Sequence, residues 1–272
     1  MNSKHDIIND NDALAIKACC ADVYQSDWAR LLLGDSFHPG GTALTDYLGH
    51  ALHLGPDSRV LDVATGQGTS AIYLAQQFGC TVLGIDYSHA NMKDITQAAQ
   101  TAGVGHLVTF EQGDAECLPV PAHSFDAIIC ECAFCTFPHK TIAASEFMRV
   151  LKVGGRVGLS DLTRQGELPE DLQGLLAWIA CIADAQPLAD YVHYLREAGL
   201  ITDLVEEHNE ALSNMVRDIQ GKLLGTELLV KLKKINLPST IDFEQGKTLA
   251  RNAAAAIKAQ KFGYAVITAT KP

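Results

Sequence analysis

The sequence predicts an α/β fold built on a mostly parallel sheet. From residue 59 onwards, short runs rich in Val, Ile and Leu alternate with longer helical patterns. These runs are apolar throughout, which is typical of strands that helices cover on both faces. The chain has 272 residues, 47% of them hydrophobic and 19% charged, so it contains enough apolar side chains for a substantial core.

Seven strands are expected in chain order, at residues 59–64, 81–86, 107–112, 125–132, 156–161, 201–206 and 264–270. Helices are expected between them, at residues 69–78, 89–102, 141–151, 168–183 and 188–198, with a helix-rich segment over 209–261. The helix at 141–151 is expected to end at the turn formed by Gly154 and Gly155. No repeat or linker divides the chain. We therefore expect a helical N-terminal lid over residues 1–55 and a main domain over 56–272, with helical insertions at about 163–200 and 209–261.

The charge balance argues against some partners. Lys and Arg total 21 against 32 Asp and Glu, a net charge of −11, which disfavours binding to nucleic acid or to anionic membranes. The N-terminus lacks the apolar core of a secretory signal, and the longest apolar run, residues 175–183, is too short to cross a membrane. We expect a cytoplasmic monomer or homodimer whose 8 cysteines are mostly reduced.

A glycine-containing loop follows the first strand. Its sequence, DVATGQG (residues 62–68), leads directly into a helix. Glycines at such a loop let the backbone approach a ligand closely, and ligands of open α/β sheets bind at the carboxyl ends of the strands. Gly66, Gly68 and Ala71 also match the dinucleotide pattern G-x-G-x-x-A, with Asp86 at a suitable distance for a ribose, so an NAD-binding oxidoreductase is one alternative.

Acidic residues at three successive strand ends favour a different ligand. Asp62, Asp86 and Asp114 close the first, second and third strands. Asp62 precedes the glycines, where a carboxylate would repel a pyrophosphate. Together the three acids offer acceptors for an amine, a ribose diol and an amino group. These are the groups that S-adenosylmethionine (SAM) carries.

These motifs resemble those of class I SAM-dependent methyltransferases of the ubiquinone-methylase-like superfamily. The matching segments lie between about residues 55 and 162 and are VLDVATGQG, GIDYS, GDAECLP, FDAIIC and EFMRVLKVGGRVGLSD. GYAVITATKP resembles the closing antiparallel strand of that family. The resemblance implies a Rossmann-like seven-stranded sheet and a SAM cofactor.

The resemblance also implies roles for individual residues. Asp62 and Gly66 correspond to positions that line the methionine portion, Asp86 to the ribose position, and Asp114 with Ala115 to the adenine position. The remaining matching positions in the cofactor loops are Ala64, which replaces the family's commonest first glycine, Gly68 and Tyr87. The stretch YQSDW resembles an N-terminal lid segment, in which Tyr24 would cover SAM.

Cysteines follow the fourth strand in the sequence CECAFCTFPHK (residues 130–140). Thiolates are soft ligands that capture thiophilic ions. The segment resembles the arsenite methyltransferases, and the likeness implies that Cys132 and Cys181, with Cys135 as an alternate partner, hold trivalent arsenic. The chain has no thiol in LLLGDSFHPGG, where that family has a further Cys, so Cys19 or Cys20 would have to supply a third one. No resident metal cofactor is expected.

Several alternatives to a metalloid acceptor stay open. A small organic molecule could be methylated on carbon, oxygen or nitrogen, with His38, His139 or Glu131 as general base. The aromatic residues near such an acceptor would be Phe134, Phe137, Trp178 and Tyr191. Cysteines can also be plain packing residues, as expected for Cys80, Cys117 and Cys130. A SAM-binding protein without catalytic activity is a further possibility.

Overall fold

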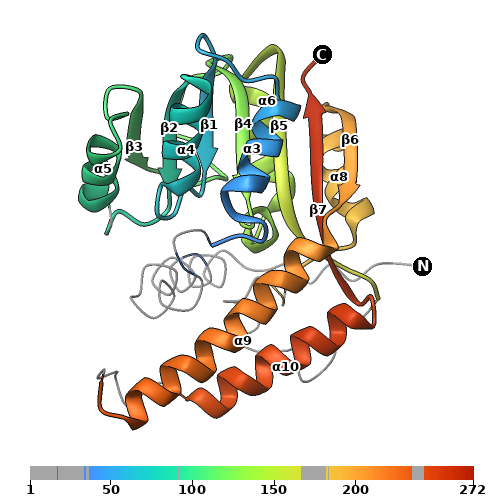
Figure 1. The fold of residues 1–272 in the computed structure, drawn as a ribbon. Helices are drawn as coiled ribbons and strands as arrows, with labels where there is room; N and C mark the ends of the chain where they lie inside the picture. Colours follow the sequence, from blue (N-terminus) through green and yellow to red (C-terminus); the bar gives the residue numbers. More distant parts are fainter. Residues whose placement is uncertain are drawn as a thin grey trace.

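The structure is a computed structural model that describes residues 17, 34, 37–90, 92–166, 182, 184–234 and 242–272. Its centre is a seven-stranded sheet in the order β3-β2-β1-β4-β5-β7-β6 (Figure 1). The strands are β1 (Arg59–Val63), β2 (Thr81–Asp86), β3 (Val108–Gln112), β4 (Phe125–Glu131), β5 (Leu151–Arg164), β6 (Ile201–Glu207) and β7 (Phe262–Thr270). Of these strands only β7 runs against its neighbours, β5 and β6, so the predicted mostly parallel sheet with an antiparallel last strand is confirmed.

The helices lie on both faces of the sheet. The described helices are α3 (Gly41–Ala51), α4 (Thr69–Phe78), α5 (Met92–Thr101), the short 3-10 helix η1 (Phe134–Thr136), α6 (Lys140–Val150), α8 (Leu188–Glu197), α9 (Asn209–Lys231) and α10 (Phe243–Lys258). Right-handed crossovers from β1 to β2 to β3 place α4 and α5 on one face. The crossover from β4 to β5 moves in the opposite direction, so α6 lies on the other face.

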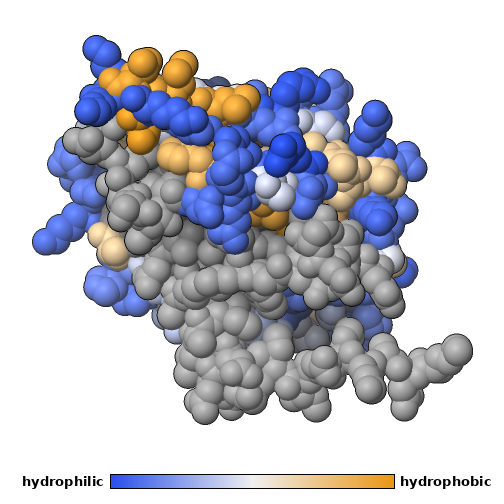
Figure 2. All heavy atoms as spheres, turned by 90° about the horizontal axis from the view of Figure 1, so that it is seen from below, coloured by the Kyte–Doolittle hydropathy of each residue, from blue (hydrophilic) through white to orange (hydrophobic). Residues whose placement is uncertain are grey.

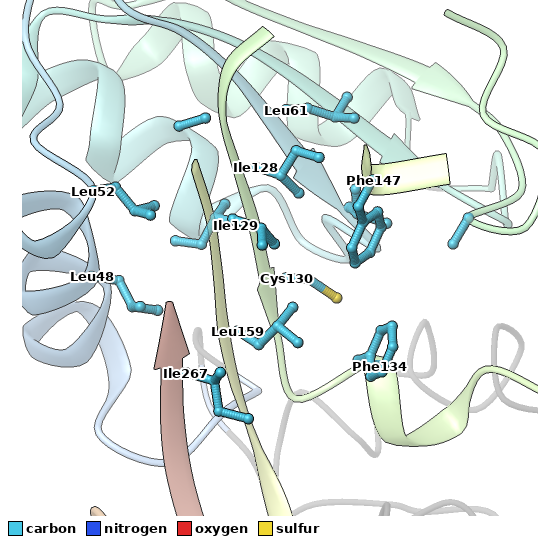
Figure 3. Close-up of a cluster of buried hydrophobic side chains, with 14 of the residues drawn as sticks. Leu48, Leu52, Leu61, Ile128, Ile129, Cys130, Phe134, Phe147, Leu159 and Ile267 are labelled. Atoms are coloured by element: carbon cyan, nitrogen blue, oxygen red, sulfur yellow. The ribbon is translucent and has the colours of Figure 1, made fainter. Parts of the chain in front are cut away.

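The core fills both sides of the central strands (Figure 3). Leu48 from α3 and Leu52, the residue that caps this helix, lie on one side of β4 and β5, while Phe134 and Phe147 lie on the other side. All four side chains are buried. The sheet is therefore covered on both faces, as the apolar strands predict.

The sequence-based expectation for the end of α6 is wrong. No glycine turn ends this helix: Val150 is its last residue, and Leu151 is already extended and begins β5. The strand continues through Gly154 and Gly155, and its pairing with β4 shifts register between Phe125 and Ala127. An added Cβ at Gly155 would lie 2.8 Å from the carbonyl oxygen of Lys152, so this irregular stretch of strand needs glycine. The expected helix at residues 168–183 falls almost wholly outside the described residues.

Two long helices extend from the edge of the sheet at which the parallel strands end (Figure 1). They are α9 and α10, which follow β6 and precede β7 in the chain and pack against each other. The far half of α9 and the residue that caps it carry four exposed leucines, Leu224, Leu228, Leu229 and Leu232. Figure 2 shows apolar side chains gathered at one corner of this end of the molecule. None of the described helices is long and apolar enough to cross a membrane.

Candidate active site

The loop between β1 and α4 is built on left-handed backbone. Ala64, Gly66 and Gly68 all have positive φ angles, of 60°, 54° and 70°. Gly68 is required sterically, because a Cβ there would lie 2.8 Å from the ring of Phe110. Non-glycine residues seldom adopt this conformation, and at Ala64 it marks a strained position beside the loop.

Asp62 lies under this loop and is 3% exposed. Its Oδ2 accepts a hydrogen bond of 2.6 Å from the hydroxyl of Thr65. Burial raises the pKa of the Asp62 carboxyl to about 7; the Thr65 hydrogen bond opposes this rise, and the neighbouring carboxylates of Glu131 and Asp86 add to it. The loop therefore holds a carboxyl that changes charge near neutral pH.

Asp86, at the end of β2, ties two loops together. Its Oδ2 accepts from the backbone N–H of Gly66 at 2.9 Å, and its Oδ1 accepts from that of Ser88 at 3.0 Å. Burial raises the pKa of Asp86, and both backbone hydrogen bonds oppose that rise. The carboxylate is thus fixed beside the glycine loop.

Asp114, which follows β3, pairs with a residue from the N-terminal segment. The Nζ of Lys17 lies 2.7 Å from Asp114 Oδ2 and 2.6 Å from Glu116 Oε2. Glu116 also accepts from the backbone N–H of His139 through Oε1, at 2.8 Å. Lys17 therefore joins the N-terminal segment to the loop that follows β3.

Glu131, the last residue of β4, lies in a buried polar cluster. Its Oε2 accepts hydrogen bonds from Ser70 at 2.6 Å and Thr45 at 3.0 Å, and lies 3.4 Å from His38 Nε2. The side chain is 3% exposed. Its other oxygen, Oε1, is buried and has no hydrogen-bond partner in the described structure.

One cavity of about 160 Å³ joins these groups. It is lined by eight of the residues predicted to bind the cofactor or a thiol-bound acceptor: Asp62, Ala64, Gly66, Asp86, Tyr87, Asp114, Ala115 and Cys132. Gly68 does not line it and instead lies at the start of α4, packed under Phe110. Tyr24 and Cys181 lie outside the described residues.

The cysteines after β4 separate into two environments. Cys132 adopts a positive φ of 53° and lines the cavity. Cys135 is fully buried, belongs to the hydrophobic core and does not line the cavity. Cys130 packs in the core near Phe134 and Phe147 (Figure 3). Among the described residues, no group of three or more His, Cys, Asp or Glu is arranged to hold a metal ion.

Sequence reasoning missed three residues of this region. Lys17 is 97 positions from Asp114, and nothing local marks their pairing. Thr45 and Ser70 meet Glu131 from two different helices, so only their folded positions reveal the cluster.

Of the organic-acceptor candidates, His38, Glu131 and Phe137 line the cavity, whereas Phe134 and Tyr191 are core residues. His139 and Phe134 are not among the lining residues, and Trp178 is not described.

Comparison with known proteins identifies the chemistry. A family model described as a methyltransferase domain matches residues 61–159. The chain is 30% identical over 234 residues to 27-O-demethylrifamycin SV methyltransferase of Amycolatopsis mediterranei, an alignment that covers 85% of this chain and 84% of that protein. The chain belongs to the SAM-dependent methyltransferases. This membership decides between the cofactor alternatives in favour of SAM and identifies the protein as an enzyme.

A further relative and a structural neighbour of the methyltransferase are also named as methyltransferases. It is 26% identical over 260 residues to the methyltransferase GfsG of Streptomyces halstedii, covering 92% of this chain and 87% of the relative. A crystal structure of a putative sarcosine dimethylglycine methyltransferase from Galdieria sulphuraria has the same fold, with a TM-score of 0.75, 18% identity, and coverage of 93% of this chain and 98% of that one. The relatives thus fix the reaction class and leave the acceptor open.

Proposed function

We propose that the methyltransferase transfers the methyl group of SAM to a small organic acceptor held in the same cavity as the cofactor. The observation that carries the proposal is that one cavity is lined both by Asp62, Asp86 and Asp114 and by Cys132 and Phe137. The three acids suit the cationic and polar groups of SAM, and the segment after β4 supplies a wall for the acceptor. Methyl transfer mainly requires that the two reactants be held in line and away from water.

In this proposal each acid binds one part of the cofactor. Asp62 and Gly66 hold the methionine portion, Asp86 the ribose hydroxyls, and Asp114 with Ala115 the adenine. Ala64 and Tyr87 line the same cofactor, while Gly68 acts indirectly by letting α4 start close to Phe110. Tyr24 remains the candidate for a covering aromatic residue.

The charge of the cavity favours neutral or cationic acceptors. Its described lining includes four carboxylates, Asp62, Asp86, Asp114 and Glu131, and the only lysine or arginine among the described lining residues is Lys17. Lys17 is already paired with Asp114 and Glu116. An anionic group at the floor of the cavity would therefore meet repulsion without a compensating cation. Relatives named as sarcosine/dimethylglycine N-methyltransferase and 27-O-demethylrifamycin SV methyltransferase support a small organic acceptor.

A thiol-bound metalloid is the second candidate, and one observation favours it: Cys132 lines the cavity. Cys135 is buried in the core on the far side of this turn, so it offers no second ligand there without rearrangement. In this version Cys132 and Cys181 hold trivalent arsenic, whose lone pair attacks the methyl carbon.

One experiment tests both candidates. Purified protein is first titrated with SAM and with NAD by calorimetry, and SAM alone is expected to bind. Release of S-adenosylhomocysteine is then followed with sarcosine, a phenol or arsenite as acceptor. Turnover with an organic probe, retained in Cys132→Ser, supports the first candidate. Formation of methylarsenicals that both Cys132→Ser and Cys181→Ser abolish supports the second, and failure to bind SAM would contradict both.

A further inference from the structure

The unpaired oxygen of Glu131 is the feature that the cofactor site leaves unexplained. Glu131 ends β4 and immediately precedes Cys132, so its carboxylate lies at the carboxyl edge of the sheet. Its Oε2 has three polar neighbours, and its Oε1 has none among the described residues. A buried carboxylate oxygen without a donor is costly, so its retention in a folded protein requires an explanation, such as a ligand or a water that supplies the missing hydrogen bond.

The hydrogen bonds to Oε2 determine which oxygen of the Glu131 carboxylate lacks a partner among the described residues. Ser70 reaches it from α4 and Thr45 from α3, with hydrogen bonds of 2.6 Å and 3.0 Å. His38, in the segment before α3, is 8% exposed and places Nε2 at 3.4 Å. Hydroxyl donors from two helices therefore hold the carboxylate in one orientation. Glu131 and Cys132 both line the cavity, so the buried remaining oxygen belongs to a residue of the cavity wall.

We propose that Oε1 of Glu131 takes a proton from the atom of the acceptor that is methylated. The acceptor atom is therefore a nitrogen or an oxygen that carries a hydrogen before the transfer. The inference rests on the proposed function and specifies its acceptor class. Ser70, Thr45 and His38 are positioning residues, because they act by orienting the carboxylate. An acceptor methylated through a lone pair without a proton, such as trivalent arsenic, would have no use for this oxygen.

The proposed step balances without a further reactant. The lone pair of the nitrogen or oxygen forms a bond to the methyl carbon, and the bond from that carbon to sulfur breaks. The electron pair of the broken bond stays on sulfur, which converts the sulfonium to neutral S-adenosylhomocysteine. The proton of the nucleophile moves to Glu131 Oε1 and passes to water after the products leave.

A cofactor analogue tests the position of this oxygen without knowledge of the acceptor. Sinefungin carries an amino-bearing carbon in place of the methyl-bearing sulfur of SAM, so its N–H donors lie close to the site of transfer. SAM and sinefungin both carry a positive charge at this point, so the general field of the acidic cavity favours both. Only sinefungin can donate a hydrogen bond to Glu131, and a charge-assisted hydrogen bond changes affinity by about tenfold or more.

The measurement is a pair of calorimetric titrations, with SAM and with sinefungin, on wild type, Glu131→Gln and Asp86→Asn. Wild type is expected to bind sinefungin at least tenfold more tightly than SAM. In Glu131→Gln the preference is expected to fall to threefold or less. Asp86→Asn is the matched control, and it should weaken both ligands similarly and keep the preference.

Three results would decide against the inference. A wild-type preference below tenfold overturns it, and this arm stands even if the Glu131→Gln variant does not fold. A preference that survives in folded Glu131→Gln overturns it as well. If neither ligand binds wild type, the proposed function itself fails, and this outcome is distinct from the other two.

Discussion

Lys17 Nζ lies 2.7 Å from Asp114 Oδ2, which joins the N-terminal segment to the loop after β3. The two side chains are 12% and 29% exposed, and Lys17 also lines the cavity. The pair therefore lies in the wall of the cavity, at the residue that we propose binds adenine.

We expect Lys17→Met to speed the dissociation of SAM by about three- to tenfold, because a partly exposed ion-pair network contributes about 1 kcal/mol. Stopped-flow displacement of bound SAM measures this rate. Lys93→Met, which removes an exposed lysine from α5, is the control and should leave the rate unchanged. Equal rates in wild type and Lys17→Met would show that Lys17 does not retain the cofactor.

Asp62 should make SAM binding depend on pH. Its pKa lies at about 7 because the carboxyl is buried, so it gains its negative charge as the pH rises through neutrality. SAM carries an ammonium and a sulfonium group, and we propose that Asp62 faces the methionine end. Affinity measured by calorimetry is therefore expected to increase between pH 6 and pH 8, and Asp62→Asn should bind weakly with little dependence over this range.

The Asp62 carboxyl should also make the stability of the ligand-free protein depend on pH. Stability is expected to fall as the pH rises, whereas the affinity for SAM increases. Its pKa is raised from 3.8 to about 7 in the folded chain, so between these values the folded state holds a proton that the unfolded state has released. Stability therefore falls as the pH rises through this interval. Thermal melts of wild type should show a steeper fall than those of Asp62→Asn, and identical pH profiles would contradict the assignment.

Gly68 and Gly103 form a matched pair for testing the cofactor loop. Both have positive φ angles, of 70° and 80°, but an added Cβ meets the Phe110 ring at 2.8 Å at Gly68 and nothing within 4 Å at Gly103. Gly103→Ala should cost only the left-handed strain, about 1–2 kcal/mol. Gly68→Ala adds overpacking of about 1–3 kcal/mol and should also weaken SAM binding. Urea unfolding and calorimetry measure both effects, and equal losses in the two variants would be inconsistent with this explanation.

The cysteines should differ in their reaction with iodoacetamide. Cys117 is exposed and Cys132 is partly exposed at the cavity, whereas Cys80 is buried and burial raises its pKa to about 11. Saturating S-adenosylhomocysteine is expected to slow the labelling of Cys132 at least tenfold and to leave Cys117 unchanged. Cys80 should react only after unfolding. Peptide mass spectrometry follows each site, and unprotected Cys132 would place the cofactor elsewhere.

Local patterns predicted most of the sheet, because a buried strand or the helix beside it can be recognised from the hydrophobic pattern of consecutive residues. The expected helix at 69–78 and strand at 81–86 match α4 and β2. The start of β5 was missed because Leu151 pairs with Phe125 across a register shift, and such pairing depends on residues far apart in the chain.

The position of Asp62, Asp86 and Asp114 in one cavity was equally accessible to sequence reasoning, since parallel strands bring their carboxyl ends to one edge. The arrangement of the residues after β4 was not. Cys132 leaves β4 in a left-handed conformation, and η1 then turns Cys135 into the core. A run of cysteines in the sequence does not reveal that reversal, so the resemblance to arsenite methyltransferases suggested Cys135 as an alternate partner of Cys132, although Cys135 does not line the cavity.

The helical pair α9 and α10 leaves the sheet and returns to it at neighbouring points. The backbone N–H of His208, just before α9, donates to the carbonyl of Tyr264 in β7 at 2.6 Å. A short turn could therefore bridge the two strands without altering their order or register. It follows that the pairing of β6 with β7 does not fix the length of this excursion, although its Leu212, Ala253 and Ala256 belong to the hydrophobic core.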